Sequence, residues 1–169
     1  MVGALRSAAV ANDLRLGDLE AIRAVKYAYL RLLDCKQFEE LGLLLTDDVT
    51  TAYQSGALRH QGRQEVVAFL QRSLGDGGVV TMHNCHHPEI RFHGDDEATG
   101  TWYLEDLVIA PHQDFELHGS AIYSDRYRRV DGAWLISHTG YDRIFERQKR
   151  LSTGATTSFS SRFERDENA

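Results

Sequence analysis

The sequence predicts a single α+β domain in which helices pack on one face of a curved antiparallel sheet. Its 169 residues are 42% apolar and 26% charged, which is usual for a globular protein and gives enough chain for one hydrophobic core. Apolar residues recur at helical spacing before Gly78 and at alternate positions after it. Helices followed by a run of long strands are typical of α+β domains, because each layer must bury its apolar side against the other.

The first helix is expected from Asp18, whose carboxylate suits an N-cap, to about Asp34. Residues 1–17 before it are interpreted as a flexible leader. The apolar side of this helix consists of residues that recur at helical spacing, namely Leu19, Ile22, Val25, Tyr29 and Leu33.

Two shorter helices are expected next, over residues 38–45 and 62–74. Residues 46–48 are interpreted as a stop between the first of them and a short β segment at 49–53. Four residues, Gly75-Asp76-Gly77-Gly78, end the last helix because glycine favours helix termination.

Four long strands are expected in the second half of the chain. Asp131-Gly132 lies between the last two and signals a two-residue hairpin. Pro88 has no amide hydrogen for a sheet ladder, so its strand should lie at an edge or contain a bulge. Helices do not fill the concave side of such a sheet completely, so we expect a ligand pocket there. The strands span 79–92, 98–110, 117–130 and 134–145, and the polar tail 147–169 is either disordered or draped over a neighbour.

The composition argues against several classes of function. The formal net charge is −6 and basic residues cluster only near Arg147, so we expect no binding to nucleic acid. No apolar run approaches the roughly 18–20 residues that cross a bilayer, so no membrane association is expected. Cys35 and Cys85 are too few for a disulfide framework, which indicates reduced thiols and a cytoplasmic location.

Histidines concentrate in the run Met82-His83-Asn84-Cys85-His86-His87. On a strand His83, Cys85 and His87 would share one face, at intervals of roughly 6–7 Å. This spacing suits two metal ligands but rarely three, and no ligand pair elsewhere supports a site, so no metal is expected. His83 has two interpretations: a hydrogen-bonded core histidine, or a group that transfers protons.

Acidic residues on apolar surfaces favour the second interpretation of His83. Strand alternation puts Trp102, Leu104 and Asp106 on one side, and burying an acid there is costly unless it is paired. A carboxylate that orients an imidazole and stabilises its protonated form would explain that cost. Asp34, at the end of the first helix, is by default a solvated carboxylate.

Three further residues remain ambiguous. Tyr29 lies on the apolar side of the first helix, where packing is its simplest role, and Tyr53 has the same ambiguity. Arg143 is either a surface charge at the end of the last strand, a partner of a buried acid, or a ligand of an anionic substrate group.

Together these segments resemble the SnoaL-like branch of the nuclear-transport-factor-2-like superfamily, and within it they are most similar to the bile acid 7α-dehydratases. Scytalone dehydratases, ketosteroid isomerases and hexachlorocyclohexane dehydrochlorinases belong to the same superfamily. The resemblance covers roughly Asp18 to Glu146. It is carried by the segments Tyr27–Asp34, Met82–His83, His86–Ile90, Ala98–Asp106 and Thr139–Ile144.

The resemblance implies a cone of about three helices on a strongly curved sheet, with residues 18–146 as the domain and 147–169 as a tail. It makes His83 the general acid or base, Asp106 and Asp34 pocket carboxylates, and Tyr29 a donor to a substrate oxygen. Contacts to the substrate would come from Tyr53, Arg143 and Trp102. Cys85 and His87 depart from the pattern of the bile acid enzymes, which puts the substrate in doubt.

The reaction implied is loss of water from a hydroxylated, carbonyl-activated alicyclic or steroid-like molecule, without a cofactor. Isomerisation of a double bond with the same proton shuttle is an alternative. A non-catalytic ligand-binding module is another, in which His83 and Asp106 would be a structural pair. The resemblance also implies a small hydrophobic substrate and a homo-oligomer, often a trimer.

Overall fold

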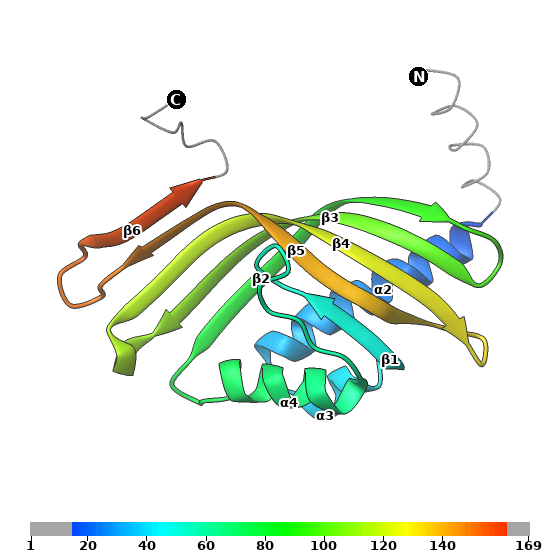
Figure 1. Ribbon diagram of the computed structural model, residues 1–169, viewed down its shortest axis with the longest axis horizontal. Coiled ribbons are helices and arrows are strands. Elements are labelled where there is room, and N and C mark those ends of the chain that lie inside the picture. Colours follow the sequence, from blue (N-terminus) through cyan, green and yellow to red (C-terminus); the bar gives the residue numbers. More distant parts are fainter. Residues whose placement is uncertain (1–14, 162–169) are drawn as a thin grey trace, which may run out of the picture.

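The computed structural model describes residues 15–161, which form the α+β arrangement of the SnoaL-like fold predicted from the sequence. Figure 1 shows the sheet arched over helix α2 (Leu16–Asp34), with α3 (Phe38–Gly42) and α4 (Arg63–Leu74) beneath it. None of the described helices is long and apolar enough to span a bilayer. The strands are β1 (Leu45–Ala52), β2 (Val80–Phe92), β3 (Glu97–Ala110), β4 (Phe115–Val130), β5 (Ala133–Lys149) and β6 (Thr156–Ser161).

The six strands form one mixed sheet in the order β1-β5-β4-β3-β2. β1 runs parallel to the first half of β5, where Leu45 pairs with Ile136, and the other pairs are antiparallel. β6 pairs with the second half of β5, along the stretch that begins at Phe145. β2 therefore lies at one edge of the sheet, directly beside β3.

The hydrophobic core lies between α2 and the face of the sheet turned toward it. Along β3 every second residue from Ala98 to Asp106 is buried, as the alternation predicted. Two bonded aromatic side chains cross this core, since the Trp102 indole donates to the Tyr127 hydroxyl at 3.0 Å. The largest apolar side chains with at most 1% of their surface exposed include Trp102, Tyr29, Tyr127, Ile22, Leu41, Leu45, Leu104 and Ile136.

The first helix ends at Asp34 as predicted, but Asp18 is not its N-cap. The helix begins at Leu16, so Asp18 lies in the first turn, and its carboxylate accepts hydrogen bonds from Arg15 at 2.7 and 2.9 Å. Of the predicted leader, residues 1–14 lie outside the described residues.

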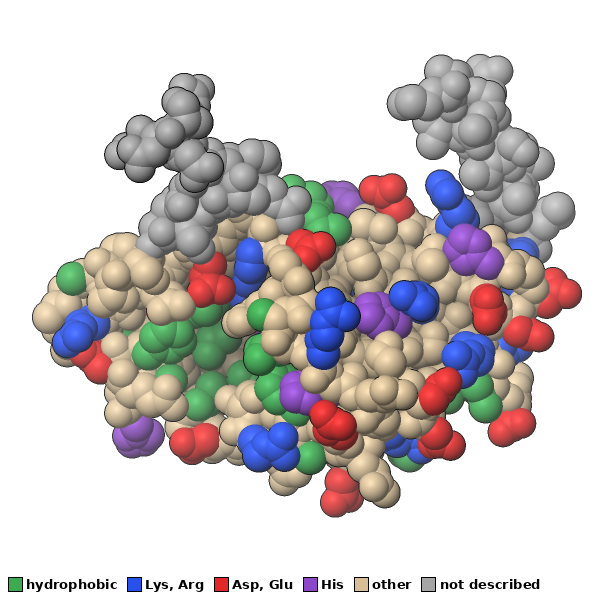
Figure 2. All heavy atoms as spheres, in the orientation of Figure 1, with side chains coloured by type: hydrophobic (Ala, Val, Ile, Leu, Met, Phe, Trp, Pro, Cys, Tyr) green, Lys and Arg blue, Asp and Glu red, His purple; other side chains and the backbone are tan. Residues whose placement is uncertain are grey.

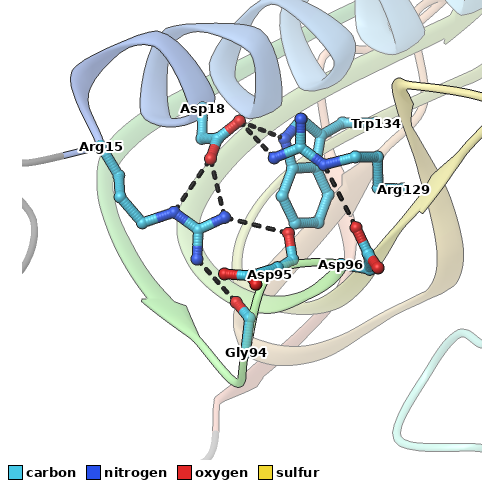
Figure 3. A network of polar contacts seen from close by, with 7 residues as sticks. All are labelled: Arg15, Asp18, Gly94, Asp95, Asp96, Arg129 and Trp134. Carbon is cyan, nitrogen blue, oxygen red and sulfur yellow. Dashed lines mark hydrogen bonds and ion pairs between the residues drawn. The ribbon is translucent and has the colours of Figure 1, made fainter.

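Figure 3 shows that Asp18 joins the start of α2 to two hairpins. Arg129 and the Trp134 indole donate to the other carboxylate oxygen at 2.5 and 3.0 Å. Arg15 also donates to the Gly94 carbonyl at 2.6 Å, in the turn between β2 and β3. Burial opposes ionisation of Asp18, but the hydrogen bonds from Trp134, Arg15 and Arg129 dominate and lower its pKa to about 2.

Two boundaries differ from the prediction. Residues 46–48 are not a stop: β1 begins at Leu45, and α3 ends earlier, at Gly42. The described part of the predicted tail belongs largely to the sheet, because residues 147–149 continue β5 and residues 156–161 form β6. Residues 162–169 of the tail lie outside the described residues. Thr46 is buried, so the polar run 46–48 is partly accommodated inside the fold.

The turn and edge signals were correct. Asp131 and Gly132 both have positive φ, as a tight two-residue hairpin between β4 and β5 requires. Around Pro88 the register of β2 against β3 shifts between His86 and Glu89. His87 in this bulge has a φ of 50°.

Candidate functional site

His83 and Asp34 form a hydrogen-bonded pair where the end of α2 meets β2. Nδ1 of His83 lies 2.6 Å from Oδ1 of Asp34, and the backbone amide of His83 donates to Oδ2 at 2.9 Å. The Thr81 hydroxyl donates to Oδ1 at 2.8 Å. The imidazole is 9% exposed and the carboxylate 22%, so the pair is shielded from water without being sealed off.

The carboxylate is held in place by the way α2 ends. Amides of Lys36 and Gln37 bond back to the carbonyls of Leu33 and Leu32 at 3.2 and 2.9 Å. Lys36 has a φ of 60°, which completes a Schellman motif with a left-handed residue after the helix. Asp34 is thus the last residue of a firmly ended helix, which fixes its direction toward β2.

The pairing determines which nitrogen of His83 carries a proton. Burial works against the charge of Asp34, but hydrogen bonds from His83 and Thr81 outweigh it and lower the pKa of the carboxyl group. An ionised carboxylate only accepts hydrogen bonds, so Nδ1 of His83 is the donor. Nε2 is then the basic nitrogen, the arrangement that acid–base catalysis by histidine uses.

Asp106 has a different partner from the one predicted. It lies directly opposite His83 in the β2–β3 register, but its two oxygens accept from the guanidinium of Arg143, the second at 2.8 Å. The carboxylate that bonds the imidazole is Asp34, because the end of α2 brings that residue onto Nδ1. The predicted structural pair of His83 with Asp106 is therefore wrong, whereas the pairing of Arg143 with a buried acid is observed.

The predicted tyrosines form a cluster that connects to Arg143. The hydroxyls of Tyr29 and Tyr53 lie 3.0 Å apart, and the Tyr53 ring packs on Tyr141 at 5.5 Å. The guanidinium of Arg143 lies 4.9 Å from the Tyr141 ring centre. Burial raises the pKa of Tyr29 and of Tyr53, so both remain protonated hydrogen-bond donors at neutral pH.

Trp102 has a packing role in the structure. Its side chain has no exposed surface, and its ring meets Tyr27 edge-on at 6.0 Å. Contact with a substrate stays a prediction for this residue.

Sequence reasoning missed a buried ion pair between Lys26 and Asp125. Nζ of Lys26 lies 2.8 Å from Oδ2 of Asp125, both side chains are fully buried, and the ammonium lies 3.4 Å from the Tyr123 ring centre. The Tyr127 hydroxyl donates to the same carboxylate oxygen at 2.8 Å. The signal was present: Lys26 follows Ile22 by four residues on the apolar side of the helix.

Thr81 and Lys36 were also missed. Thr81 precedes His83 by two residues, so strand alternation puts both side chains on one face, and this could have been read from the sequence. Lys36, whose ammonium donates to the Thr81 hydroxyl at 3.3 Å, gave no comparable signal because its position depends on its left-handed backbone.

Cys85 and His87 do not combine with His83 into a ligand set. Within residues 15–161 no three His, Cys, Asp or Glu side chains are grouped so that they could hold a metal ion. Burial raises the pKa of Cys85 to about 12, so it is a neutral thiol at physiological pH. His87 lies in the bulge, which interrupts the alternation assumed for this strand.

A hollow is visible on the molecule in Figure 2. Hydrophobic side chains gather in a recess in the left half of the view, between the long strands and α4. Two grooves lie elsewhere: one is lined largely by β1, β4 and β5, and the other by these strands together with β3.

Comparison with solved structures finds the same fold in proteins named for several activities. A scytalone dehydratase-like protein of Novosphingobium aromaticivorans superposes with a TM-score of 0.71 at 21% identity, over 91% of this chain and 93% of that one. The hexachlorocyclohexane dehydrochlorinase LinA-type3 of Novosphingobium barchaimii gives 0.69 at 19% identity, over 88% and 93%. An aromatic ring hydroxylase-like protein of N. aromaticivorans gives 0.71 at 14%, over 86% and 94%.

These likenesses show a shared fold, and the differing activities in the names show that one fold carries several chemistries. Residues 14–140 match the SnoaL-like domain family. This match spans most of the sheet and all three described helices. The chain therefore belongs to the SnoaL-like domain family.

Proposed function

We propose that the protein is a cofactor-independent lyase that eliminates water from a hydroxylated, carbonyl-activated alicyclic or steroid-like molecule. The observation that carries the proposal is the His83–Asp34 pair, with its 2.6 Å hydrogen bond and a basic Nε2. Solved structures of the same fold include a scytalone dehydratase-like protein and a hexachlorocyclohexane dehydrochlorinase, whose names denote the loss of water and of hydrogen chloride. The resemblance of the sequence to the bile acid 7α-dehydratases supports a steroid-like substrate.

In this mechanism His83 acts twice. Nε2 removes a proton from the carbon next to the substrate carbonyl, and Asp34 stabilises the imidazolium that forms. The electron pair of the C–H bond moves toward the carbonyl oxygen and then forms the new double bond as the C–O bond breaks. The imidazolium returns its proton to the departing hydroxyl, so water leaves and the histidine is regenerated.

The paired hydroxyls of Tyr29 and Tyr53 would stabilise the intermediate. The enolate oxygen carries negative charge, and a fixed, protonated donor in a water-poor environment lowers its energy. One of the two hydroxyls can donate to the other, which leaves one proton for the substrate.

The test is turnover of a panel of hydroxylated alicyclic and steroid ketones, followed by mass spectrometry for the loss of one water. We expect His83→Ala to lower kcat roughly 10²–10⁴-fold, because the proton acceptor is removed. Asp34→Asn should lower kcat by a similar order while leaving KM almost unchanged, because the imidazole loses its anionic partner. Both variants should keep the melting temperature of the wild type within a few degrees.

His86→Ala is the matched control, since His86 is exposed and lies on the opposite face of the same strand. It should retain full activity. Full activity in His83→Ala would overturn the proposal. A product of unchanged mass with a moved double bond would replace elimination by isomerisation, and ligand binding without turnover would indicate a non-catalytic module.

A further inference from the structure

A groove with basic character lies on the face of the sheet turned away from α2. Its volume is about 490 Å³, and it is lined by parts of β1, β5 and β4, by the loop after β1 and by the start of α4. Strand alternation defines the face, because Thr51, Thr139 and Asp125 beside it are buried in the interior. The argument rests on six of the lining residues: Thr50, Arg59, His60, Glu65, Arg126 and His138.

Three of these side chains form a row across neighbouring strands. Thr50 pairs with His138 in the β1–β5 register, and His138 pairs with Arg126 in the β5–β4 register. Thr50 Oγ1 lies 2.7 Å from Nδ1 of His138, which fixes the ring and leaves Nε2 for a ligand. Within residues 15–161 the guanidinium of Arg126 makes no hydrogen bond or ion pair.

Arg59 is held over the groove by its own loop. Its Nε donates to the Gly56 carbonyl at 2.9 Å, and the guanidinium covers the position that a side chain at residue 56 would occupy. The donors on its two terminal nitrogens make no hydrogen bond with any described residue. Arg59 therefore presents an ordered cation whose outer donors remain available.

The charges that face His138 are mostly positive. Burial lowers the pKa of His138, and Arg126 and Arg59 lower it further, while the buried Asp125 opposes them. Asp125 is already paired with Lys26, and Glu65 lies 3.0 Å from Nδ1 of His60. Among the described residues neither arginine has a carboxylate partner, although the chain carries a net charge of −6.

The imidazole of His60 also lines the groove. Its ring stacks on Phe69 at 4.1 Å, and its Nε2 is buried without a hydrogen-bond partner among the described residues. Figure 2 shows Lys or Arg and His side chains side by side in the middle of this view of the molecule.

We propose that this groove binds the phosphate group of a small organic phosphate. A phosphate dianion offers the doubly charged, multi-oxygen acceptor that two guanidinium groups and an imidazole match, whereas a carboxylate carries only one charge. The groove is larger than a phosphate ion, and a second groove of about 300 Å³ shares Thr50 and Arg126 with it. The organic part of the ligand would lie there. This site is separate from the His83 pair, which faces the opposite side of the sheet.

The test measures, by NMR, how the ring resonances of His138 change with pH. These resonances are identified because they are lost in the His138→Gln variant. The titration uses sodium sulfate, which stays a dianion from pH 5 to 8, against sodium chloride of equal ionic strength. Bound anion should favour the protonated ring, so sulfate should raise the pH at which His138 titrates by about half a unit or more. The effect should saturate with sulfate concentration.

The double variant Arg59→Gln/Arg126→Gln should bind sulfate at least roughly tenfold more weakly. Arg72→Gln, at an exposed arginine of α4 outside the groove, is the matched control and should bind like the wild type. Circular dichroism should give the same melting curve for all three proteins. An equal response in the double variant, or no saturable response in the wild type, would overturn the proposal.

Three further ligands, namely phenyl phosphate, inorganic phosphate and benzoate, separate the possible sources of the bound anion. At pH 8, phenyl phosphate should bind more tightly than inorganic phosphate if the organic part contacts the second groove. Tighter binding of inorganic phosphate would overturn the assignment to an organic phosphate. Stronger binding of benzoate than of phenyl phosphate would overturn the assignment to a phosphate altogether.

Discussion

At the scale of single residues, the two carboxylates near His83 differ in their partners. Asp34 bonds the imidazole itself, whereas the charge of Asp106 is matched by the guanidinium of Arg143. Asp106 and His83 occupy paired positions on neighbouring strands, so any loosening of Arg143 would present a second negative charge to the ring. Arg143 therefore keeps the charge of Asp106 matched beside the His83–Asp34 pair.

Gly119 leaves room for the ion pair between Arg143 and Asp106. A β-carbon at this position would lie 2.6 Å from Nη1 of Arg143 and 3.1 Å from Oδ1 of Asp106. Gly119→Ala should push the guanidinium away and reduce stability by about 1–3 kcal/mol. Urea unfolding measures this loss. Gly77→Ala, where a β-carbon meets no atom within 4 Å, should leave the free energy of unfolding almost unchanged. A free energy of unfolding in Gly119→Ala equal to that of the wild type would contradict this role of Gly119.

The residue types of this site could be predicted from the sequence, but their pairing could not. Alternation along β3 predicted that Asp106 is buried, and helical spacing predicted that Tyr29 faces the core. The choice of Asp34 over Asp106 as the partner of His83 depends on where α2 ends in space. Local periodicity in the sequence carries no information on the contact between His83 and Asp34, because 49 residues separate the two side chains.

At the scale of elements, the start of α2 depends on contacts with distant hairpins. Asp18 receives donors from Arg15, Arg129 and Trp134, which come from the helix start and from both strands of the β4–β5 hairpin. A helix that begins without a side-chain N-cap is thus anchored through its first turn.

The lowered pKa of Asp18 predicts a pH-dependent stability. The folded value of about 2 lies below the unfolded value near 3.8, so the contribution is complete above pH 4 and is lost as the pH falls toward 2. Asp18→Asn should reduce the free energy of unfolding by about 1–3 kcal/mol at pH 7. Urea unfolding at pH 7 and at pH 2.5 measures both values. The same difference between variant and wild type at the two pH values would disprove the expected linkage.

Element types were predictable from periodicity, and the errors have physical causes. The polar run 46–48 looks like a loop, but it lies within β1, between Leu45 and Thr50, which both pair with β5, and the register shifts across it. Pairing on either side of the run outweighs its local preference. The Ser- and Thr-rich tail likewise gave no apolar alternation, yet 156–161 joins the sheet because β5 extends past residue 145 and offers it a partner.

At the scale of the whole molecule, a charged pair lies in the centre of the hydrophobic core. Lys26 comes from α2 and Asp125 from β4, so the pair joins the helix to the middle of the sheet. Two charges without contact with water are stabilised only while each has the other.

Lys26→Met should therefore destabilise the protein by about 3–5 kcal/mol, because an uncompensated buried carboxylate remains. The double variant Lys26→Met/Asp125→Asn should recover part of that loss, since the amide is neutral and its oxygen still accepts from Tyr127. Urea unfolding of the single and double variants measures the coupling. A double variant less stable than the sum of the two single changes would show that the pair is not the source of the effect.

The family match ends at residue 140, whereas β5 runs to Lys149 and β6 covers its outer side. β1 pairs only with the first half of β5, so among residues 15–161 β6 is the one strand beside the second half on that side. A protein trimmed at the family boundary would lose β6 and the end of β5, and one trimmed after Lys149 would expose a bare row of amides and carbonyls. Such a row recruits strands from other molecules, so we expect a chain without β6 to aggregate more readily than the full chain.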